Sequence, residues 1–140
     1  MRGRKTNWVI GCLLTWQLLP GLGWAADALP PDRSVEIAGI QTVCTGVSLD
    51  ARQNPRWSEF PLKVEFAGPG GQYVGSEAVT VRKAGTEILA VTCSGPWLLF
   101  GLPPGRYEVS ATLEGQTSTS AAFVPNHGQG RIILRFSGTL

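Results

Sequence analysis

Residues 107–113, YEVSATL, place an apolar side chain at every second position. Successive side chains of a β-strand point to opposite faces, so this period of two predicts a strand with one buried face. The same alternation marks further stretches at 62–66, 79–82, 89–93 and 132–136. Weaker strands are expected at 35–43, 97–100 and 117–124. The chain is therefore predicted to be all-β.

Short segments rich in glycine, proline and asparagine separate the predicted strands, at 68–71, 84–85, 94–96, 103–105, 114–115 and 126–128. Each predicted strand has one apolar face, so the strands require two sheets packed face to face. Seven or eight short strands with turns at this spacing predict a two-sheet antiparallel β-sandwich. A chain of 140 residues has room for one such domain.

One stretch, residues 48–60 (SLDARQNPRWSEF), lacks the alternation. Ser48 is predicted to cap a short helix over 49–53, because a serine hydroxyl accepts hydrogen bonds from the first free N–H groups of a helix. Pro55 restricts the residue before it to extended backbone, which ends the helix. This short helical insertion is the expected place for a binding function, because loops on a rigid scaffold frequently carry functional residues.

The N-terminus has the pattern of a secretory signal peptide. Three basic residues within the first five precede a mostly apolar run at 8–19, and small residues then allow cleavage after Ala25 or Ala28. The apolar run is shorter than the ~20 residues that span a bilayer, so no membrane insertion is expected after cleavage.

The chain is accordingly predicted to consist of a signal peptide at 1–25, a flexible leader at 26–33 and the β-sandwich domain at 34–140. The leader, ADALPPDR, is small, polar and rich in proline, which is typical of a loose chain end. The expected location of the mature protein is the periplasm, or the medium if it is secreted.

The sequence carries 12 Lys and Arg against 10 Asp and Glu, but three of the basic residues lie in the predicted signal peptide. The mature domain would therefore have nine basic and ten acidic residues. Without a net positive charge or a basic cluster, it lacks the electrostatic basis for binding nucleic acid.

Two cysteines, Cys44 and Cys93, remain after removal of the predicted signal peptide. In an exported chain, two cysteines are most simply a disulfide formed in an oxidising compartment. The alternative of two free or metal-ligating thiols lacks partners, because the chain has one histidine and no Cys-x-x-Cys motif.

The loop after the predicted strand at 97–100 contains Pro103, Pro104, Gly105 and Tyr107. Proline followed by glycine suits the two central positions of a type II turn, where glycine supplies the positive φ. Tyr107 then begins the next strand, with its ring in the core and its hydroxyl bonded near the sheet end. Every residue of the loop thus has a structural role, and we predict a turn rather than a reactive loop.

The segment GPWLLFGLPPGRYEVSATLEGQTSTSAAF resembles the carboxypeptidase regulatory-like domains, which are small transthyretin-like, or prealbumin-like, sandwiches grouped with carbohydrate-binding-like folds. Residues 102–111 follow their pattern L-P-P-G-x-Y-x-V-x-A. The chain also looks like small exported proteobacterial proteins that carry such a domain, whose G-x-x-x-D-x-R segment falls here at 46–52 and whose following strand falls at 61–66. The resemblance covers roughly residues 46–136 and implies the fold, because the matched residues lie mostly in turns and the core.

The residue inventory does not predict an enzyme. His127 is the only histidine and lies in a glycine-containing turn, and no G-x-S-x-G nucleophile motif is present. Asp27, Asp32 and Asp50 are far apart in the sequence, which argues against a calcium loop. We expect no catalytic residues, no metal ligands and no cofactor.

Two aromatic residues are candidate binding residues. Trp57 follows Arg56 in the polar insertion, where an exposed indole could stack on a sugar ring or anchor a partner protein. The alternative is that Trp57 folds back onto an open end of the sandwich. Tyr73 is a similar, weaker candidate, whereas Trp97 begins a very apolar strand and is expected in the core beside Cys93.

The expected function is that of an exported, non-catalytic accessory or interaction domain of the cell envelope. Its partner would be an envelope protein, contacted through the insertion at 48–60 or through a sheet edge. The alternative is a carbohydrate-binding module in which Trp57, with Tyr73, forms a platform for a glycan.

Overall fold

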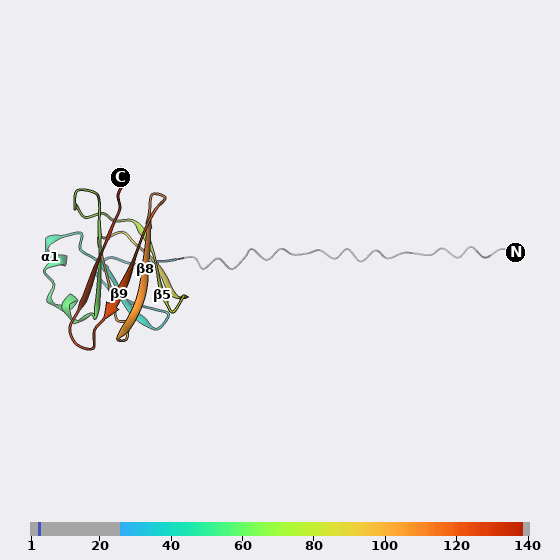
Figure 1. Ribbon diagram of the computed structural model, residues 1–140, viewed down its shortest axis with the longest axis horizontal. Helices are drawn as coiled ribbons and strands as arrows, with labels where there is room; N and C mark the ends of the chain where they lie inside the picture. The colour runs from blue at the N-terminus through green and yellow to red at the C-terminus, as the bar shows by residue number, and fades with distance from the viewer. Residues whose placement is uncertain (1–2, 4–25, 139–140) are drawn as a thin grey trace.

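The computed structural model describes Gly3 and residues 26–138, and it forms two five-stranded sheets packed face to face (Figure 1). Sheet A contains, in spatial order, β1 (Asp27–Ala28), β6 (Thr86–Cys93), β5 (Glu77–Lys83), β8 (Gly105–Leu113) and β9 (Gln116–Val124). Sheet B contains β10 (Gly130–Arg135), β4 (Leu62–Ala67), β7 (Trp97–Phe100), β3 (Ile40–Thr45) and β2 (Ser34–Ile37). The predicted all-β sandwich is confirmed.

Three details differ from the prediction. The described residues form ten strands rather than seven or eight, because β1 was not predicted and one predicted strand is two. The sheets are mixed rather than purely antiparallel, because β1 runs parallel to β6 and β10 runs parallel to β4. The stretch predicted as one strand at 35–43 is a hairpin, with a turn at Ala38 and Gly39. Both turn residues have positive φ, of 50° and 80°, which is the geometry that two-residue hairpins favour.

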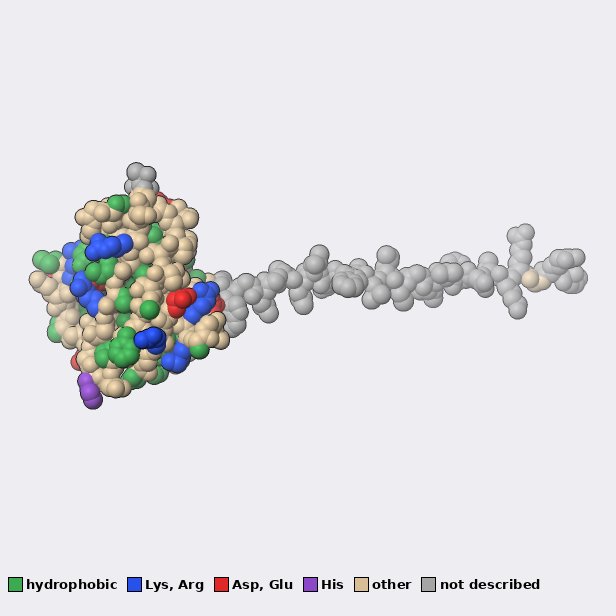
Figure 2. All heavy atoms as spheres, in the orientation of Figure 1, with side chains coloured by type: hydrophobic (Ala, Val, Ile, Leu, Met, Phe, Trp, Pro, Cys, Tyr) green, Lys and Arg blue, Asp and Glu red, His purple; other side chains and the backbone are tan. Residues whose placement is uncertain are grey.

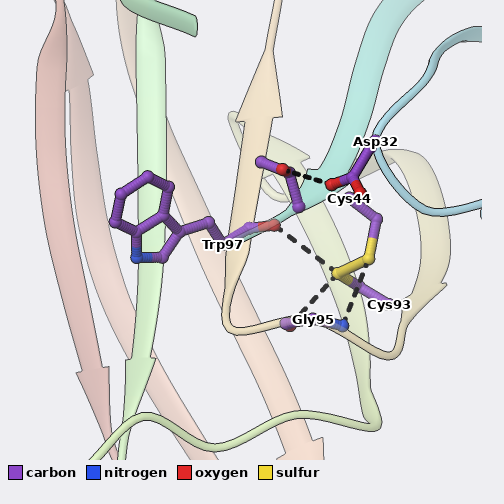
Figure 3. The surroundings of a disulfide bond; sticks show 6 residues. Asp32, Cys44, Cys93, Gly95 and Trp97 are labelled. Carbon is purple, nitrogen blue, oxygen red and sulfur yellow. Dashed lines mark hydrogen bonds between the residues drawn. A yellow bond between two sulfur atoms is a disulfide. The ribbon is translucent and has the colours of Figure 1, made fainter. Parts of the chain in front are cut away.

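The core lies between the sheets and is built from the alternating apolar residues of the predicted strands. The largest fully buried apolar side chains include Leu62, Phe66, Leu98, Phe100 and Leu134 from sheet B, Phe136 directly after β10, and Val79 and Val81 from sheet A. The predicted disulfide joins Cys44 of β3 to Cys93 of β6, with the Cα atoms 5.5 Å apart (Figure 3). It therefore links sheet A to sheet B.

The loop before β8 has the structural role that the sequence predicts, but not the predicted type II geometry, in which the glycine would have a φ of about 80°. Tyr107 is buried, and its hydroxyl donates a 2.7 Å hydrogen bond to the carbonyl oxygen of Pro103. Burial raises the pKa of the Tyr107 hydroxyl above its usual range, so the proton that makes this bond is retained. Gly105 has a φ of 149°, which a residue with a side chain rarely adopts.

The segment expected to be a flexible leader is instead part of the fold. Asp27 and Ala28 pair with β6, and the side chain of Leu29 joins the core. The N–H of Asp32 bonds to the carbonyl oxygen of Cys44 at 2.8 Å, while the hydroxyl of Thr45 bonds to the Asp32 carboxylate. The prediction was wrong because a two-residue strand leaves no alternation in the sequence.

The predicted signal peptide lies outside the described residues, apart from Gly3. Among the residues that are described, no helix is long and apolar enough to cross a membrane.

The insertion forms helix α1 (Leu49–Arg52) and a 3-10 helix, η1 (Pro55–Glu59). As predicted, Ser48 caps α1, accepting a 3.0 Å hydrogen bond from the N–H of Ala51. The 3-10 helix was not predicted. Asn54 caps it and proline begins it, an arrangement that suits the first turn of a helix. The insertion covers part of the outer face of sheet B, on the opposite side of the molecule from β5 (Figure 1).

Candidate functional site

Trp57 is not the exposed platform that the sequence suggested. Its side chain is 5% exposed and packs on Val43 and Leu99, on the outer face of sheet B. The indole N–H donates a 2.8 Å hydrogen bond to the carbonyl oxygen of Ala51. The apolar ring finds a partner because β3 and β7 present apolar side chains on both of their faces. The alternative, in which Trp57 folds back onto the sandwich, is correct in that the ring is buried. The ring covers the outer face of sheet B, however, and not an open end of the sandwich.

Arg56 is exposed beside Trp57, with its guanidinium carbon 6.0 Å from the centre of the indole ring. Because that ring is buried, Arg56 and Trp57 together do not form a stacking surface. The remaining candidate, Tyr73, lies elsewhere, in the loop between β4 and β5, and it is 43% exposed.

Tyr73 belongs to a group of side chains on the outer face of sheet B. We call this group the cation–aromatic cluster; it consists of Arg52, Lys63, Glu65, Tyr73, Trp97 and Arg131. Its members come from α1, β4, the loop after β4, β7 and β10. Side chains from five separate segments therefore meet on one surface.

Trp97 is the buried centre of the cluster. Its side chain is buried, as predicted, but it lies on the outer face of sheet B, and its indole points away from the disulfide (Figure 3). The Lys63 ammonium sits 3.4 Å from the centre of a Trp97 ring, within the range of a cation–π contact. On another side is Gly46, where a Cβ atom would come within 2.8 Å of the ring. The missing side chain of Gly46 thus gives Trp97 room.

Tyr73 meets Trp97 edge to face, with ring centres 6.0 Å apart. The guanidinium carbon of Arg52 lies 4.9 Å from the centre of the Tyr73 ring. Arg52 is itself held by a 2.7 Å hydrogen bond from its Nε to the carbonyl oxygen of Gly46. The chain of contacts therefore runs from Lys63 through the two aromatic rings to Arg52.

Glu65 is the single acidic member of the cluster and is nearly fully buried. The Arg131 guanidinium donates to its carboxylate, with Nε 2.6 Å from Oε2. The Lys63 ammonium lies 3.4 Å from Oε1, and the Tyr73 hydroxyl donates to the same oxygen at 3.5 Å. A buried charge requires such partners, so Glu65 fixes the positions of the side chains around it.

The cluster carries three positive side chains and one negative side chain. Two of the positive groups are exposed: Arg52, and Arg131, whose side chain is 57% exposed. The accessible surface is therefore a tyrosine ring flanked by guanidinium groups, above a rigid buried support. Such a surface can hydrogen-bond and stack, but it has no histidine, thiol or free carboxylate for catalysis.

Sequence reasoning identified only Tyr73 of these residues. One signal for the rest was available, because residues 97–100 are apolar without alternation, which is typical of a strand covered on both faces. Lys63 and Glu65 were correctly expected to face away from the core, but nothing local showed that they face each other and Arg131.

Two other features of the described residues bear on chemistry. No group of three or more His, Cys, Asp and Glu side chains there is placed to hold a metal ion. The carboxyl oxygens of Glu77 and the indole Nε1 of Trp97 are buried without a hydrogen-bond partner. Burial raises the pKa of Glu77 to about 9, because nearby protein excludes the water that would stabilise its charge.

No protein-family model matches this chain. No curated protein sequence matches it either. The resemblance to the carboxypeptidase regulatory-like domains therefore remains a prediction from the quoted motifs.

Proposed function

We propose that this chain is an exported, non-catalytic domain of the cell envelope that binds a protein through the cation–aromatic cluster. The observation that carries the proposal is Tyr73, an exposed aromatic side chain flanked by the guanidinium groups of Arg52 and Arg131. Tyrosine and arginine are enriched among the residues that dominate protein–protein binding energy.

The rigidity of the cluster supports this function. Tyr73 is held by its edge contact with Trp97, and Arg131 is held by the buried carboxylate of Glu65. Side chains that are ordered before binding lose less conformational entropy on association. A fixed aromatic ring between fixed cations is therefore a more effective contact than the same residues on a mobile loop.

The charge of the cluster indicates the chemistry of the partner. Three positive groups against the single carboxylate of Glu65 leave a positive surface on a domain whose mature charge is near neutral. Electrostatic complementarity favours a partner surface rich in Asp and Glu. We therefore expect an acidic protein segment to dock over Tyr73.

Export is supported by two features. The N-terminal sequence has the pattern of a signal peptide, and the disulfide between Cys44 and Cys93 joins the two sheets. Structural disulfides persist in oxidising compartments such as the periplasm. The glycan alternative loses its main support on this face, because Trp57 is buried.

The test is affinity capture from cross-linked envelope extract, with the exported protein as bait. The Tyr73→Ser and Arg52→Ala baits should lose the captured partner. The matched control is Arg33→Ala, which removes an exposed arginine directly before β2, outside the cluster, and should leave capture unchanged. Equal capture by all four baits, or capture of glycan alone, would contradict the proposal.

A further inference from the structure

A second surface with a defined shape lies on sheet A, remote from the cation–aromatic cluster. It is a shallow basin of about 500 Å³ at one end of the sheet, lined by the β5–β6 turn, by residues at the ends of β5, β8 and β9, and by the buried Tyr107. We call it the sheet A basin. Its charged lining residues are Arg82, Lys83, Arg106 and Glu108.

The basin is positively charged because its cations are only partly neutralised. Glu108 makes a long ion pair with Arg82, at 3.9 Å. For Lys83 and Arg106, no carboxylate lies within ion-pairing distance among the described residues. Glu87, the cross-strand partner of Arg82 on β6, adds a second carboxylate beside these residues, so three cations against two carboxylates leave a net positive basin, which attracts anionic groups.

Lys83 is held in position rather than free. Its ammonium lies 4.4 Å from the centre of the Tyr107 ring, and the Tyr107 hydroxyl is bonded to Pro103. A Cβ atom at Gly105 would come within 2.8 Å of the ammonium, so this glycine leaves the space that Lys83 occupies. The turn at 103–105 therefore also fixes a cation at the edge of the basin.

An exposed aromatic ring adjoins these cations. Phe123 of β9 is 65% exposed and is the cross-strand partner of Arg106 on the outer face of sheet A. Figure 2 shows the molecule from the side on which β5, β8 and β9 are labelled in Figure 1. Lys and Arg side chains lie close to hydrophobic side chains on this side. The exposed ring is therefore accessible to a ligand in the basin.

The rest of this face carries hydroxyl groups. Ser110 faces Thr119, with their hydroxyl oxygens 2.6 Å apart, and Thr112 faces Thr117 at 3.0 Å. These pairs continue the outward face of β8 and β9 away from the basin. The face thus offers cations for acidic groups, an aromatic ring for the face of a sugar, and hydroxyls for hydrogen bonds along an extended ligand.

We infer that the outer face of sheet A binds an acidic polysaccharide, with a carboxylate or phosphate group of the glycan in the sheet A basin and a sugar ring on Phe123. A protein partner is favoured by an apolar centre. The insertion beside the cation–aromatic cluster offers the exposed Val47 and Leu49, whereas Phe123 is the one large exposed hydrophobic side chain of sheet A among the described residues. The site is separate from the proposed protein-binding surface, so either can fail without the other.

The test is direct titration of the exported protein, followed by backbone amide chemical shifts. The probes are an oligogalacturonate, its neutral methyl ester, and a phosphorylated oligosaccharide. We expect at least one of the two acidic probes to shift the amides of Arg106, Ala121 and Phe123, and the methyl ester to leave them unchanged. No shift with either acidic probe, or equal shifts with the ester, overturns the proposal.

Variants separate this site from general attraction to charge. Arg106→Gln and Phe123→Ser should each weaken binding by about tenfold, the usual scale for losing one charge-assisted or stacking contact. The matched control, Arg135→Gln, removes an exposed arginine from sheet B. Because salt screens a charge at that distance from the basin, this variant should change the affinity less than about twofold. If Arg135→Gln weakens binding as much as Arg106→Gln, the attraction is diffuse. If Phe123→Ser has no effect, the ligand is not held as a sugar, and the assignment is wrong.

Discussion

The indole N–H of Trp57 donates a 2.8 Å hydrogen bond to the carbonyl oxygen of Ala51 and so ties the 3-10 helix to α1. The same ring covers Val43 and Leu99 on the outer face of sheet B. The amide of Gln129 donates in turn to the carbonyl oxygens of Trp57 and Phe60, at 2.7 and 2.9 Å. Trp57 is therefore a packing residue that fixes the insertion beside the cation–aromatic cluster.

The first prediction concerns the burial of Trp57. Trp57→Ala should lower the free energy of unfolding by about 3–5 kcal/mol, because it removes a large buried side chain. Trp57→Phe retains much of the packing and loses the N–H donor, so its cost should be smaller. Urea denaturation measures both. Arg56→Ala, next in the chain but exposed, is the control and should stay within about 0.5 kcal/mol of wild type. A Trp57→Ala protein as stable as the control would show that the ring is not in the core.

The second prediction concerns the disulfide. Cys44 and Cys93 close a loop with a sequence separation of 49 residues. In the chain-entropy picture, such a link stabilises the fold by about 4 kcal/mol. The double variant Cys44→Ala/Cys93→Ala should therefore unfold at lower urea concentration than wild type. In the wild-type protein, denatured without reductant, neither cysteine should react with a thiol label, and labelling of both would contradict the pairing.

The third prediction is a pH dependence that originates at Glu77. Burial is the larger effect, the backbone of Glu77 itself offsets only part of it, and the pKa of about 9 keeps the carboxyl protonated at neutral pH. In the unfolded chain the same group ionises near its ordinary pKa of 4.5. Between these two values the folded state holds a proton that the unfolded state releases, so stability falls as pH rises.

The expected slope from Glu77 alone is about −1.4 kcal/mol per pH unit between pH 5 and pH 8. Glu77→Gln cannot ionise, so it should flatten the profile and be more stable than wild type at pH 8. Urea titrations at several pH values measure the difference between the two proteins. Parallel profiles for wild type and Glu77→Gln would mean that Glu77 does not bind the proton.

The fourth prediction concerns processing of the N-terminus. Cleavage after Ala28 would remove both residues of β1, whereas cleavage after Ala25 leaves β1 intact. Leu29 follows directly and is buried in the core. We therefore expect the exported protein to begin at Ala26, as read by N-terminal sequencing or intact mass. A start at Leu29 would show that β1 is dispensable to the mature fold.

Much of the fold followed from local pattern. The alternation at 107–113 predicted β8, and the prolines and glycine before it predicted the turn that the Tyr107 hydroxyl closes. Ser48 was predicted to cap a helix, and the two cysteines that follow a signal-peptide pattern were predicted to pair. Each of these inferences depends on residues close in sequence or on the absence of any other partner.

The candidate site did not follow in the same way. Arg131 and Glu65 meet only because β10 lies parallel to β4, and such non-local pairing leaves no trace in either segment alone. Trp57 was offered as an exposed binding residue because its neighbours in sequence are polar. Its contacts, Val43 and Leu99, are distant in the chain and could not be recognised from that segment. Local polarity describes the loop around a residue, not the surface onto which it folds.

The central claim is that Tyr73 lies at a protein interface, and site-specific photo-cross-linking in living cells tests it most directly. A photoreactive phenylalanine derivative at position 73 should yield a discrete cross-linked protein adduct, and Arg52→Ala in the same chain should abolish it. The same derivative at position 123, on the opposite sheet, should not give that adduct. Absence of an adduct at position 73, or the same adduct from both positions, would contradict the account.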